Sequence, residues 1–435
     1  MMDMNTTAYE RTVDLFLDVV SNEYPVKGSS IAGISTAVSV NGDIVHAYAA
    51  GTSGIAGEAL DENTVFRIAS ISKPITAAAV LLLIEQGKLS LDTKVYDALA
   101  QRFPSIPSRN LPGATIDQLR QVTVRDLLRH TSGWNFLHSS TSVGWDPMLN
   151  DEEIRKQRYG SDAGAHPLPV TKADILEVNW AFREKDSGTS YANVNYCLLG
   201  RLIESIVGED YGDFVKHEVF GRGRVSGFEL GHTRSSERLP RETHYFDSRG
   251  APQWPSAMGD PGPVDGPYGR WNVDNMDSHG GWVATPSALT QFADALFVRG
   301  SILNGDSLTS IQSERKNQYG LGWVVWQDLD RKPPNNWRRY HRGLLSGSTS
   351  FLMHLPSRDD GHVCYAVTLN TADFAGKLID KMDLSAQMST AMWHAVDSLL
   401  PGKLTPAPLE AIAHLDFMQE PSSKRLDGFE VAPDS

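Results

Sequence analysis

Cysteine, positive charge and long apolar runs are all scarce in this chain. Its 435 residues include only two cysteines, Cys197 and Cys364, each within an apolar stretch. Two such distant thiols do not build a disulfide framework, so we expect both to be free and buried. The longest apolar run, residues 77–84, is too short to cross a bilayer, and the first twenty residues lack the pattern of a signal peptide. These absences predict a cytoplasmic protein that does not contact membranes.

The shortage of positive charge excludes another class of partner. The chain carries 40 Lys and Arg against 53 Asp and Glu, which gives a formal net charge of -13 at pH 7. No basic stripe interrupts this acidic balance, so nucleic acid is not an expected partner. His, Cys and Glu residues do not cluster at metal-ligand spacing, so we predict neither a metal nor another cofactor. Nothing in the sequence specifies an oligomeric state.

The N-terminal part of the chain predicts one helix and a hairpin. A helical period runs through residues 7–20. Its apolar residues on or near one face are Val13, Leu15, Phe16, Leu17 and Val20. Residues 33–40 and 43–50 have the character of strands, and the Asn41-Gly42 pair between them is the strongest short-range hairpin signal. We therefore expect the chain to open with a helix, a strand, a tight turn and a second strand.

Strands return near the C-terminus. Residues 319–326, 349–354 and 363–369 are candidate strands, and a closing helix is predicted over residues 377–399. Near the other end, residues 70–86 predict a helix that is apolar nearly all round and is therefore buried on every side. Sheet-forming segments thus lie at both ends of the chain.

The middle of the chain has a different character. Short helical segments there are separated by long loops rich in Gly, Pro, Ser and Asp; they are residues 116–121, 124–130, 173–179 and 196–207. We predict an α+β fold, in which an antiparallel sheet from both chain ends is flanked by helices and carries an inserted, mainly helical lobe. Residues 1–95 and 272–400 would form the sheet lobe, 96–271 the helical lobe, and 401–435 a polar tail. The active site is expected between the lobes.

A candidate nucleophile stands at the start of the buried helix. In Ser70-Ile71-Ser72-Lys73-Pro74, a helix that begins near Ser70 places Lys73 one turn later on the same face. Serine is a weak nucleophile unless a base takes its proton, and a lysine can be that base. Pro74 is tolerated only in the first helical turn, which places the helix start near Ser70. Ser72 is a rival nucleophile, although it faces away from Lys73.

Two later segments supply candidate partners for this pair. Tyr191-Ala192-Asn193 precedes a helix: the phenol could act as acid or base, and Asn193 could orient Lys73 or bind a substrate carbonyl. The alternative is a loop tyrosine followed by a helix-capping asparagine. His341-Arg342-Gly343 then leads into a Gly/Ser-rich stretch. His341 could donate to a substrate or move a proton, unless it is only a surface histidine before a turn.

Taken together, these segments resemble a known superfamily. Ser70-x-x-Lys73, Tyr191-x-Asn193 and His341-x-Gly343 come in the order typical of serine β-lactamases and penicillin-binding proteins. Residues 124–134, which include His130-Thr131-Ser132-Gly133, resemble the branch that contains class C β-lactamases, carboxylesterases and D-aminopeptidases. In that branch the segment around His130 is structural, and His279 in Ser278-His279-Gly280-Gly281 is likewise expected to be a packing residue.

The resemblance implies roles for the remaining candidates. The backbone N–H groups of Ser70 and Leu344 would form the oxyanion hole. Substrate would be bound by Asn193, His341, Arg342 and Gly343. Apart from the resemblance, Trp134 and Trp271 could line an apolar acyl pocket, or they could instead pack in the core or between the lobes. The specialist β-lactamases of this branch carry a lysine where His341 stands, so β-lactam hydrolysis is not the expected main activity. Substrate choice is expected to lie in residues 135–186 and 254–271.

Three functions follow from these expectations. The first is a serine hydrolase that cleaves an ester or amide of a small molecule or short peptide through an acyl-enzyme on Ser70. A second keeps the acyl-enzyme but transfers the acyl group to an amine or alcohol, as an acyltransferase or peptide cyclase does. A third is a binding protein on an inactive hydrolase fold, which the presence of Ser70, Lys73, Tyr191 and Asn193 disfavours.

Overall fold

The computed structural model of the chain contains one large sheet with helices on both faces. It describes residues 2–23, 32–54, 58, 60–100, 103, 116–134, 154–156, 159–179, 191–247, 251–327, 336–357, 361–372 and 384–404. The strands of the large sheet are β1 (Gly33–Val40), β2 (Asp43–Gly51), β9 (Val324–Gln327), β10 (Trp337–Leu345), β11 (Ser348–Pro356) and β12 (His362–Leu369). They are antiparallel neighbours in the order β2-β1-β12-β11-β10-β9, so strands from the two ends of the chain meet at β1 and β12.

Smaller elements surround this sheet. The short strands are β3 (Phe66–Arg67), β4 (Phe228–Leu230), β5 (Phe246–Asp247), β6 (Trp254–Pro255), β7 (Pro263–Val264), β8 (Trp282–Ala284) and β13 (Thr371–Ala372). The helices are α1 (Met2–Glu23), α2 (Ser72–Glu85), α3 (Val95–Ala100), α4 (Ile116–Gln121), α5 (Val124–Leu128), α7 (Lys172–Asn179), α8 (Asn193–Val207), α9 (Tyr211–Phe214), α10 (Gly221–Gly223), α11 (Pro286–Phe297), α12 (Gly305–Ser313) and α13 (Leu384–Leu399). None of the helices described is both long and apolar enough to span a bilayer.

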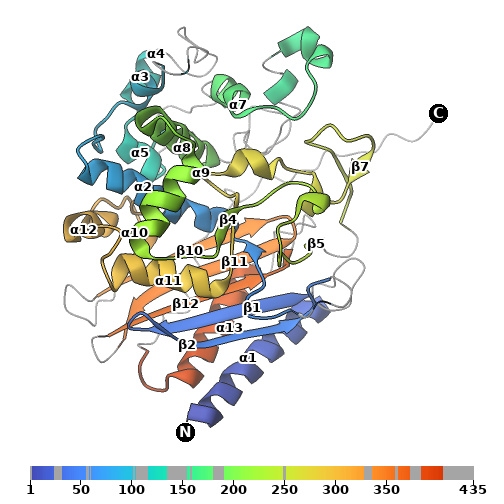
Figure 1. Ribbon diagram of the computed structural model, residues 1–435, viewed down its shortest axis with the longest axis vertical. Coiled ribbons are helices and arrows are strands. Elements are labelled where there is room, and N and C mark those ends of the chain that lie inside the picture. The colour runs from blue at the N-terminus through green and yellow to red at the C-terminus, as the bar shows by residue number, and fades with distance from the viewer. Residues whose placement is uncertain are drawn as a thin grey trace, which may run out of the picture.

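The two terminal helices cover one face of the sheet. In Figure 1, α1 and α13 lie together against one side of the strands, and α11 lies on the opposite side. Val13 of α1 and Val396 of α13 share an apolar cluster with Phe351 and Tyr365 of the sheet. The Asn41-Gly42 turn has positive φ at both residues, 54° and 94°, as the tight β1–β2 hairpin requires. The predicted α+β architecture is confirmed.

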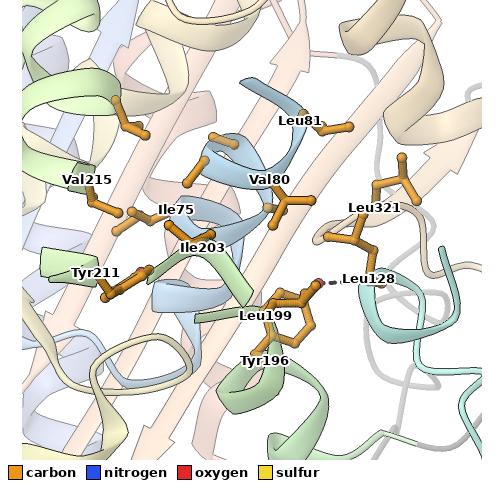
Figure 2. Packing of buried hydrophobic residues seen from close by; sticks show 14 of the residues in the cluster. Ile75, Val80, Leu81, Leu128, Tyr196, Leu199, Ile203, Tyr211, Val215 and Leu321 are labelled. Carbon is orange, nitrogen blue, oxygen red and sulfur yellow. Dashed lines mark hydrogen bonds between the residues drawn. The ribbon is translucent and has the colours of Figure 1, made fainter. Parts of the chain in front are cut away.

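A second and larger cluster surrounds α2. Every residue of this helix from Ser72 to Leu83 is buried, so its all-round apolar composition has the expected cause. Figure 2 shows Ile75 and Val80 of α2 packed among residues of α8 and neighbouring segments. The hydroxyl of Tyr196 in α8 donates to the carbonyl oxygen of Leu128 at 2.7 Å, and this hydrogen bond joins α8 to the end of α5. The core therefore fixes α2, and with it the candidate nucleophile, from several sides.

Several details differ from the sequence-based prediction. The α-helix begins at Ser72 rather than Ser70, because residues 69–71 form a 3₁₀ turn. Leu15 is 56% exposed and is not part of the apolar face of α1. The helix predicted over residues 377–399 is present from Leu384 to Leu399, and its predicted start lies outside the described residues. Both cysteines are free and buried, as predicted.

The strand around residue 319 was also placed wrongly. Only β9, Val324–Gln327, is extended there, and most of β10 was not predicted as a strand at all. The arginines in β10 interrupt the alternation of apolar and polar residues that predicts a strand. Arg338 lies 5.5 Å from the ring of Trp393, and Arg339 lies 4.7 Å from that of Phe297. The division of the chain into lobes at residues 95 and 271 stays a prediction.

Candidate active site

The segment that carries Ser70 is a strained turn held by the sheet. Ala69 has φ of 45°, a left-handed conformation that residues with a Cβ rarely adopt. The hydroxyl of Ser350 on β11 donates to the carbonyl oxygen of Ile68 at 2.8 Å, which holds the start of this turn. Ser70 itself is only partly buried. The local backbone thus presents the serine at the entrance to a helix that is otherwise enclosed.

Lys73 connects Ser70 to two other parts of the chain. Its Nζ lies 2.9 Å from Ser70 Oγ, 2.7 Å from Asn193 Oδ1 and 2.9 Å from the carbonyl oxygen of His279. The last two oxygens can only accept hydrogen bonds. They therefore accept two of the N–H groups of Lys73, and the three contacts together hold Nζ against the Ser70 hydroxyl. This arrangement is what a general base for a serine nucleophile requires.

Ser72 does not share this arrangement. Its side chain is fully buried, and its Oγ accepts the backbone N–H of Trp282 at 3.3 Å. The hydroxyl thus faces the core and binds a neighbouring segment. Between the two serines, only Ser70 is placed beside Lys73.

Tyr191 lies against Lys73 and is supported by His130. The Lys73 Nζ sits 4.8 Å from the centroid of the Tyr191 ring, and the His130 ring lies 4.4 Å from it. Nδ1 of His130 accepts the backbone N–H of Ala192 at 3.2 Å and contacts the side-chain nitrogen of Asn195 at 2.9 Å. His130 therefore holds the loop that carries Tyr191, as expected of a structural residue, although its direct contact with the tyrosine ring was not foreseen.

His341 is held inside the protein by both of its ring nitrogens. Nε2 lies 3.0 Å from the Tyr319 hydroxyl, and Nδ1 lies 2.7 Å from the carbonyl oxygen of Arg342. Its side chain is 3% exposed. A surface histidine is thus excluded, and a direct donation from His341 to substrate would require one of these two bonds to break. Sequence reasoning gave Tyr319 no role at the site, although Tyr319-Gly320-Leu321-Gly322-Trp323 resembles the same branch of the superfamily.

Burial keeps the histidines around Lys73 neutral. For His279 and His341, burial is the largest cause that lowers the pKa, to about 3, and the nearby Lys73 charge lowers it further. The same two causes hold the pKa of His130 well below its usual value. These imidazoles therefore act as neutral groups at ordinary pH, and Lys73 is the group among them that can carry positive charge.

Strand β10 passes directly over the turn before Ser70. A Cβ added at Gly343 would overlap the carbonyl oxygen of Ile68, so the close approach needs a glycine here. Leu344 follows in the same strand and pairs with Thr349 of β11. Arg342 pairs with Phe351 and so starts on the opposite face of the sheet from Gly343. The predicted role of Arg342 in binding substrate has no support from this register.

The two tryptophans have different environments. Trp271 is 5% exposed and packs in a small cluster with Ala69 and Leu345, next to Ser70 and the proposed oxyanion hole. Trp134 is 2% exposed and belongs to the main apolar core. The position of Trp271 is compatible with a role in lining an acyl pocket, whereas Trp134 lies in the apolar core. Most of the segment 135–186, which was expected to select substrate, lies outside the described residues.

A buried ion cluster positions the backbone that receives Lys73. Asp277 Oδ2 accepts hydrogen bonds from Lys172 Nζ and Arg201 Nη2, both at 2.6 Å. Burial alone would raise the pKa of Asp277, but the two cations hold it well below its usual range. The carbonyl oxygen of His279, two residues later, is the one that accepts from Lys73. Sequence reasoning missed this cluster, because its members are far apart in the chain. No group of three or more His, Cys, Asp or Glu that could hold a metal ion occurs in the described ranges.

The close approach at Gly343 gives a first testable prediction. Gly343→Ala must push β10 away from the turn before Ser70, and we expect the rate of Ser70 labelling by a fluorophosphonate to fall about tenfold or more. Gly305→Ala is the matched control, since a Cβ there meets nothing within 4 Å. Labelling kinetics followed by mass spectrometry measure both variants. An unchanged rate in Gly343→Ala would show that β10 does not shape the reactive serine.

Comparisons with known proteins agree with this fold. A penicillin-binding protein of Bacillus subtilis (strain 168) is 26% identical over 296 residues, which are 65% of this chain and 57% of that protein. The chain thus spans little more than half the length of this relative. The solved D-amino acid amidase of Ochrobactrum anthropi SV3, complexed with D-phenylalanine, superposes with a TM-score of 0.61 at 22% identity, over 91% of this chain and 98% of that one. EstCE1, a hydrolase with promiscuous acyltransferase activity, gives a TM-score of 0.62 at 18% identity, over 90% and 99% of the two chains.

The match to a family model is the decisive comparison. The model described as Beta-lactamase matches residues 22–386, a range that contains Ser70, Lys73, Tyr191 and His341. The range also spans the large sheet and α2. The chain belongs to the β-lactamase family.

Proposed function

We propose that this protein is a serine hydrolase that cleaves an ester or amide of a small molecule or short peptide through an acyl-enzyme on Ser70. The observation that carries the proposal is the 2.9 Å contact between Lys73 Nζ and Ser70 Oγ, with the two other Lys73 partners fixed as acceptors. Such a pair can activate a hydroxyl without a histidine or a metal ion.

The reaction would proceed in two stages. Lys73 takes the hydroxyl proton as Ser70 Oγ attacks the substrate carbonyl, and the backbone N–H groups of Ser70 and Leu344 bind the oxyanion. Tyr191, beside Lys73, passes a proton to the leaving group. In the second stage Tyr191 takes a proton from the attacking water and passes its own to Lys73, and Lys73 returns a proton to Ser70 Oγ as the acid leaves. Trp271 would bound the acyl group, because it packs next to Ala69 and Leu345.

Neutral substrates fit this site better than β-lactams. The specialist β-lactamases carry a lysine at the position of His341, and its ammonium helps bind the substrate carboxylate. Both ring nitrogens of His341 are already hydrogen-bonded, so His341 does not replace that ammonium. The amidase and hydrolase among the similar structures support an ester or amide substrate, although at their identities they share only the fold.

A plate assay tests the proposal. We expect p-nitrophenyl esters or D-aminoacyl amides to be turned over faster than a chromogenic cephalosporin. Intact-mass and peptide spectrometry should find the acyl adduct on Ser70. Product analysis with and without an added amine or alcohol then distinguishes hydrolysis from acyl transfer. No turnover on any substrate, together with no fluorophosphonate adduct on Ser70, would refute the proposal in favour of a binding role.

A further inference from the structure

The tautomer of His341 is set by its neighbours. Nδ1 lies 2.7 Å from the carbonyl oxygen of Arg342, which can only accept, so Nδ1 carries the ring hydrogen. In the neutral ring Nε2 is then an acceptor, and the Tyr319 hydroxyl donates to it at 3.0 Å. Both nitrogens are thus occupied, and the imidazole has no donor left for another molecule.

Tyr319 is fixed in place from outside β10. It is 1% exposed, and its ring meets the rings of Tyr191 and His130 edge-on, at centroid distances of 6.3 Å and 4.7 Å. Three residues later, a Cβ at Gly322 would overlap the side chain of Ala77 in α2. The segment is therefore pressed against the helix that carries Lys73, and Tyr319 cannot withdraw from His341 without disturbing that packing.

His341 lies on the side of β10 that faces the reaction. It shares that face with Gly343, which passes over the turn before Ser70 and is about 6.6 Å along the strand. The charged groups near its ring are Lys73 on α2 and Arg342 on its own strand, and the other titratable neighbours are Tyr319 and His130. Burial and the Lys73 charge, in that order, lower the pKa of His341 to about 3. A second cation beside Lys73 is thus prevented.

We infer that Tyr319 is a positioning residue that determines specificity: by occupying Nε2 of His341, it keeps the site selective for uncharged acyl groups over those that bear a carboxylate. The inference rests on the proposed function, because it concerns the substrate of the same site. The chemistry is simple. A neutral imidazole whose two nitrogens are already hydrogen-bonded has no donor for a carboxylate. If Nε2 were not bonded to Tyr319, it could take up a proton and donate a charge-assisted hydrogen bond.

The test compares two esters of equal chain length in the full protein. p-Nitrophenyl butyrate has an uncharged acyl group, and p-nitrophenyl hemisuccinate ends in a carboxylate. In Tyr319→Phe the donor to Nε2 is lost, so one hydrogen bond that favours the neutral ring is removed and Nε2 becomes available to carry a proton to the carboxylate. We expect the ratio of kcat/KM for hemisuccinate over butyrate to rise about tenfold, and to rise more at pH 6 than at pH 8.

Two further variants make the result decisive. Tyr211→Phe removes another buried phenol hydroxyl, which contacts Thr76 and Trp282 instead of His341, and should leave the ratio unchanged. His341→Leu should also leave the ratio unchanged, because the wild-type ring makes no bond to the carboxylate. Adding Tyr319→Phe to that background should then have no effect on the ratio.

Two outcomes would overturn the inference. One is an unchanged ratio in Tyr319→Phe, with or without an equal loss for both esters, which would make Tyr319 a structural support only. The other is a lower ratio in His341→Leu, which would show that His341 already meets the charged substrate; this measurement stands even if Tyr319→Phe does not fold. Fluorophosphonate labelling of wild-type Ser70 separates these results from a failure of the proposed function itself.

Discussion

Replacing Ser70 by alanine is expected to lower kcat/KM for the best ester substrate by at least about 10³-fold, because the attacking hydroxyl is lost. Stability should change by less than about 1 kcal/mol, since Ser70 is only partly buried and Lys73 keeps its bonds to Asn193 and His279. Steady-state kinetics and urea unfolding measure the two effects separately.

Ser72→Ala is the matched control for this prediction. Ser72 stands two residues away on the same segment, but its Oγ accepts only a long bond from Trp282, at 3.3 Å. The variant should keep its turnover and its fluorophosphonate adduct, whereas Ser70→Ala should lose both. If Ser70→Ala retained more than a tenth of the activity, the nucleophile would lie elsewhere and the proposed function would fall with it.

The same argument predicts how Lys73 behaves. Lys73→Met should reduce the labelling of Ser70 strongly, because the base that activates the hydroxyl is gone. The double variant with Ser70→Ala should be no less active than the worse single variant, since residues that act as a unit are not additive. Lys73→Met also removes the hydrogen bonds that the oxygens of Asn193 and His279 accept from Lys73, at a cost of about 1–3 kcal/mol each, so the stability of the variant must be measured alongside.

The second large effect is a steep loss of stability in acid. Four buried histidines, His130, His279, His341 and His354, have pKa values held far below 6.5, in each case first by burial. In the unfolded chain each would bind a proton near pH 6.5. Because the pKa of each histidine is lower in the folded state than in the unfolded chain, protons bind preferentially to the unfolded chain in acid. The free energy of unfolding is therefore highest above about pH 6.5 and falls as the pH decreases towards the pKa values of the folded state.

The expected size follows from proton counting. One proton bound only in the unfolded state changes the free energy of unfolding by about 1.4 kcal/mol per pH unit, so four give a slope of roughly 5.6 kcal/mol per unit below about pH 5.5. Burial raises the pKa of Asp294 and Glu204, and these carboxyls offset part of the loss. A typical domain has only about 5–15 kcal/mol of stability, so we expect unfolding between about pH 4 and 5.5.

Urea unfolding monitored by tryptophan fluorescence from pH 8 to pH 5 would measure this slope. His354→Gln removes one of the four histidines at a site away from Ser70, and should reduce the slope by about a quarter. His217→Gln, at an exposed position, should leave the slope unchanged. A free energy of unfolding that stays level down to pH 5 would contradict the assignment of these histidines as neutral, buried groups.

Local sequence patterns determined much of this protein. The Asn41-Gly42 turn and the all-round apolar helix after Ser70 both form as predicted, because hairpin turns and helical burial depend on residues close in the chain. The pairing of Ser70 with Lys73 has the same origin, since three residues make almost one helical turn. The order of the three elements was sufficient to indicate the family.

Other features were decided only when distant segments packed together. β10 is a strand despite its arginines, because rings from elsewhere in the fold shelter their guanidinium groups. Arg342 falls on the far face through its register with Phe351, which no local pattern encodes. Nε2 of His341 is occupied by the hydroxyl of Tyr319, which lies 22 residues away in the chain.

The site divides in the same way. The sequence by itself determined which residues could react, because nucleophile and base lie within one helical turn. Tertiary structure decided which neighbouring groups are charged and which of their hydrogen-bonding atoms are already occupied. Those depend on burial and on hydrogen bonds between residues as far apart as Lys73 and His279, 206 positions along the chain.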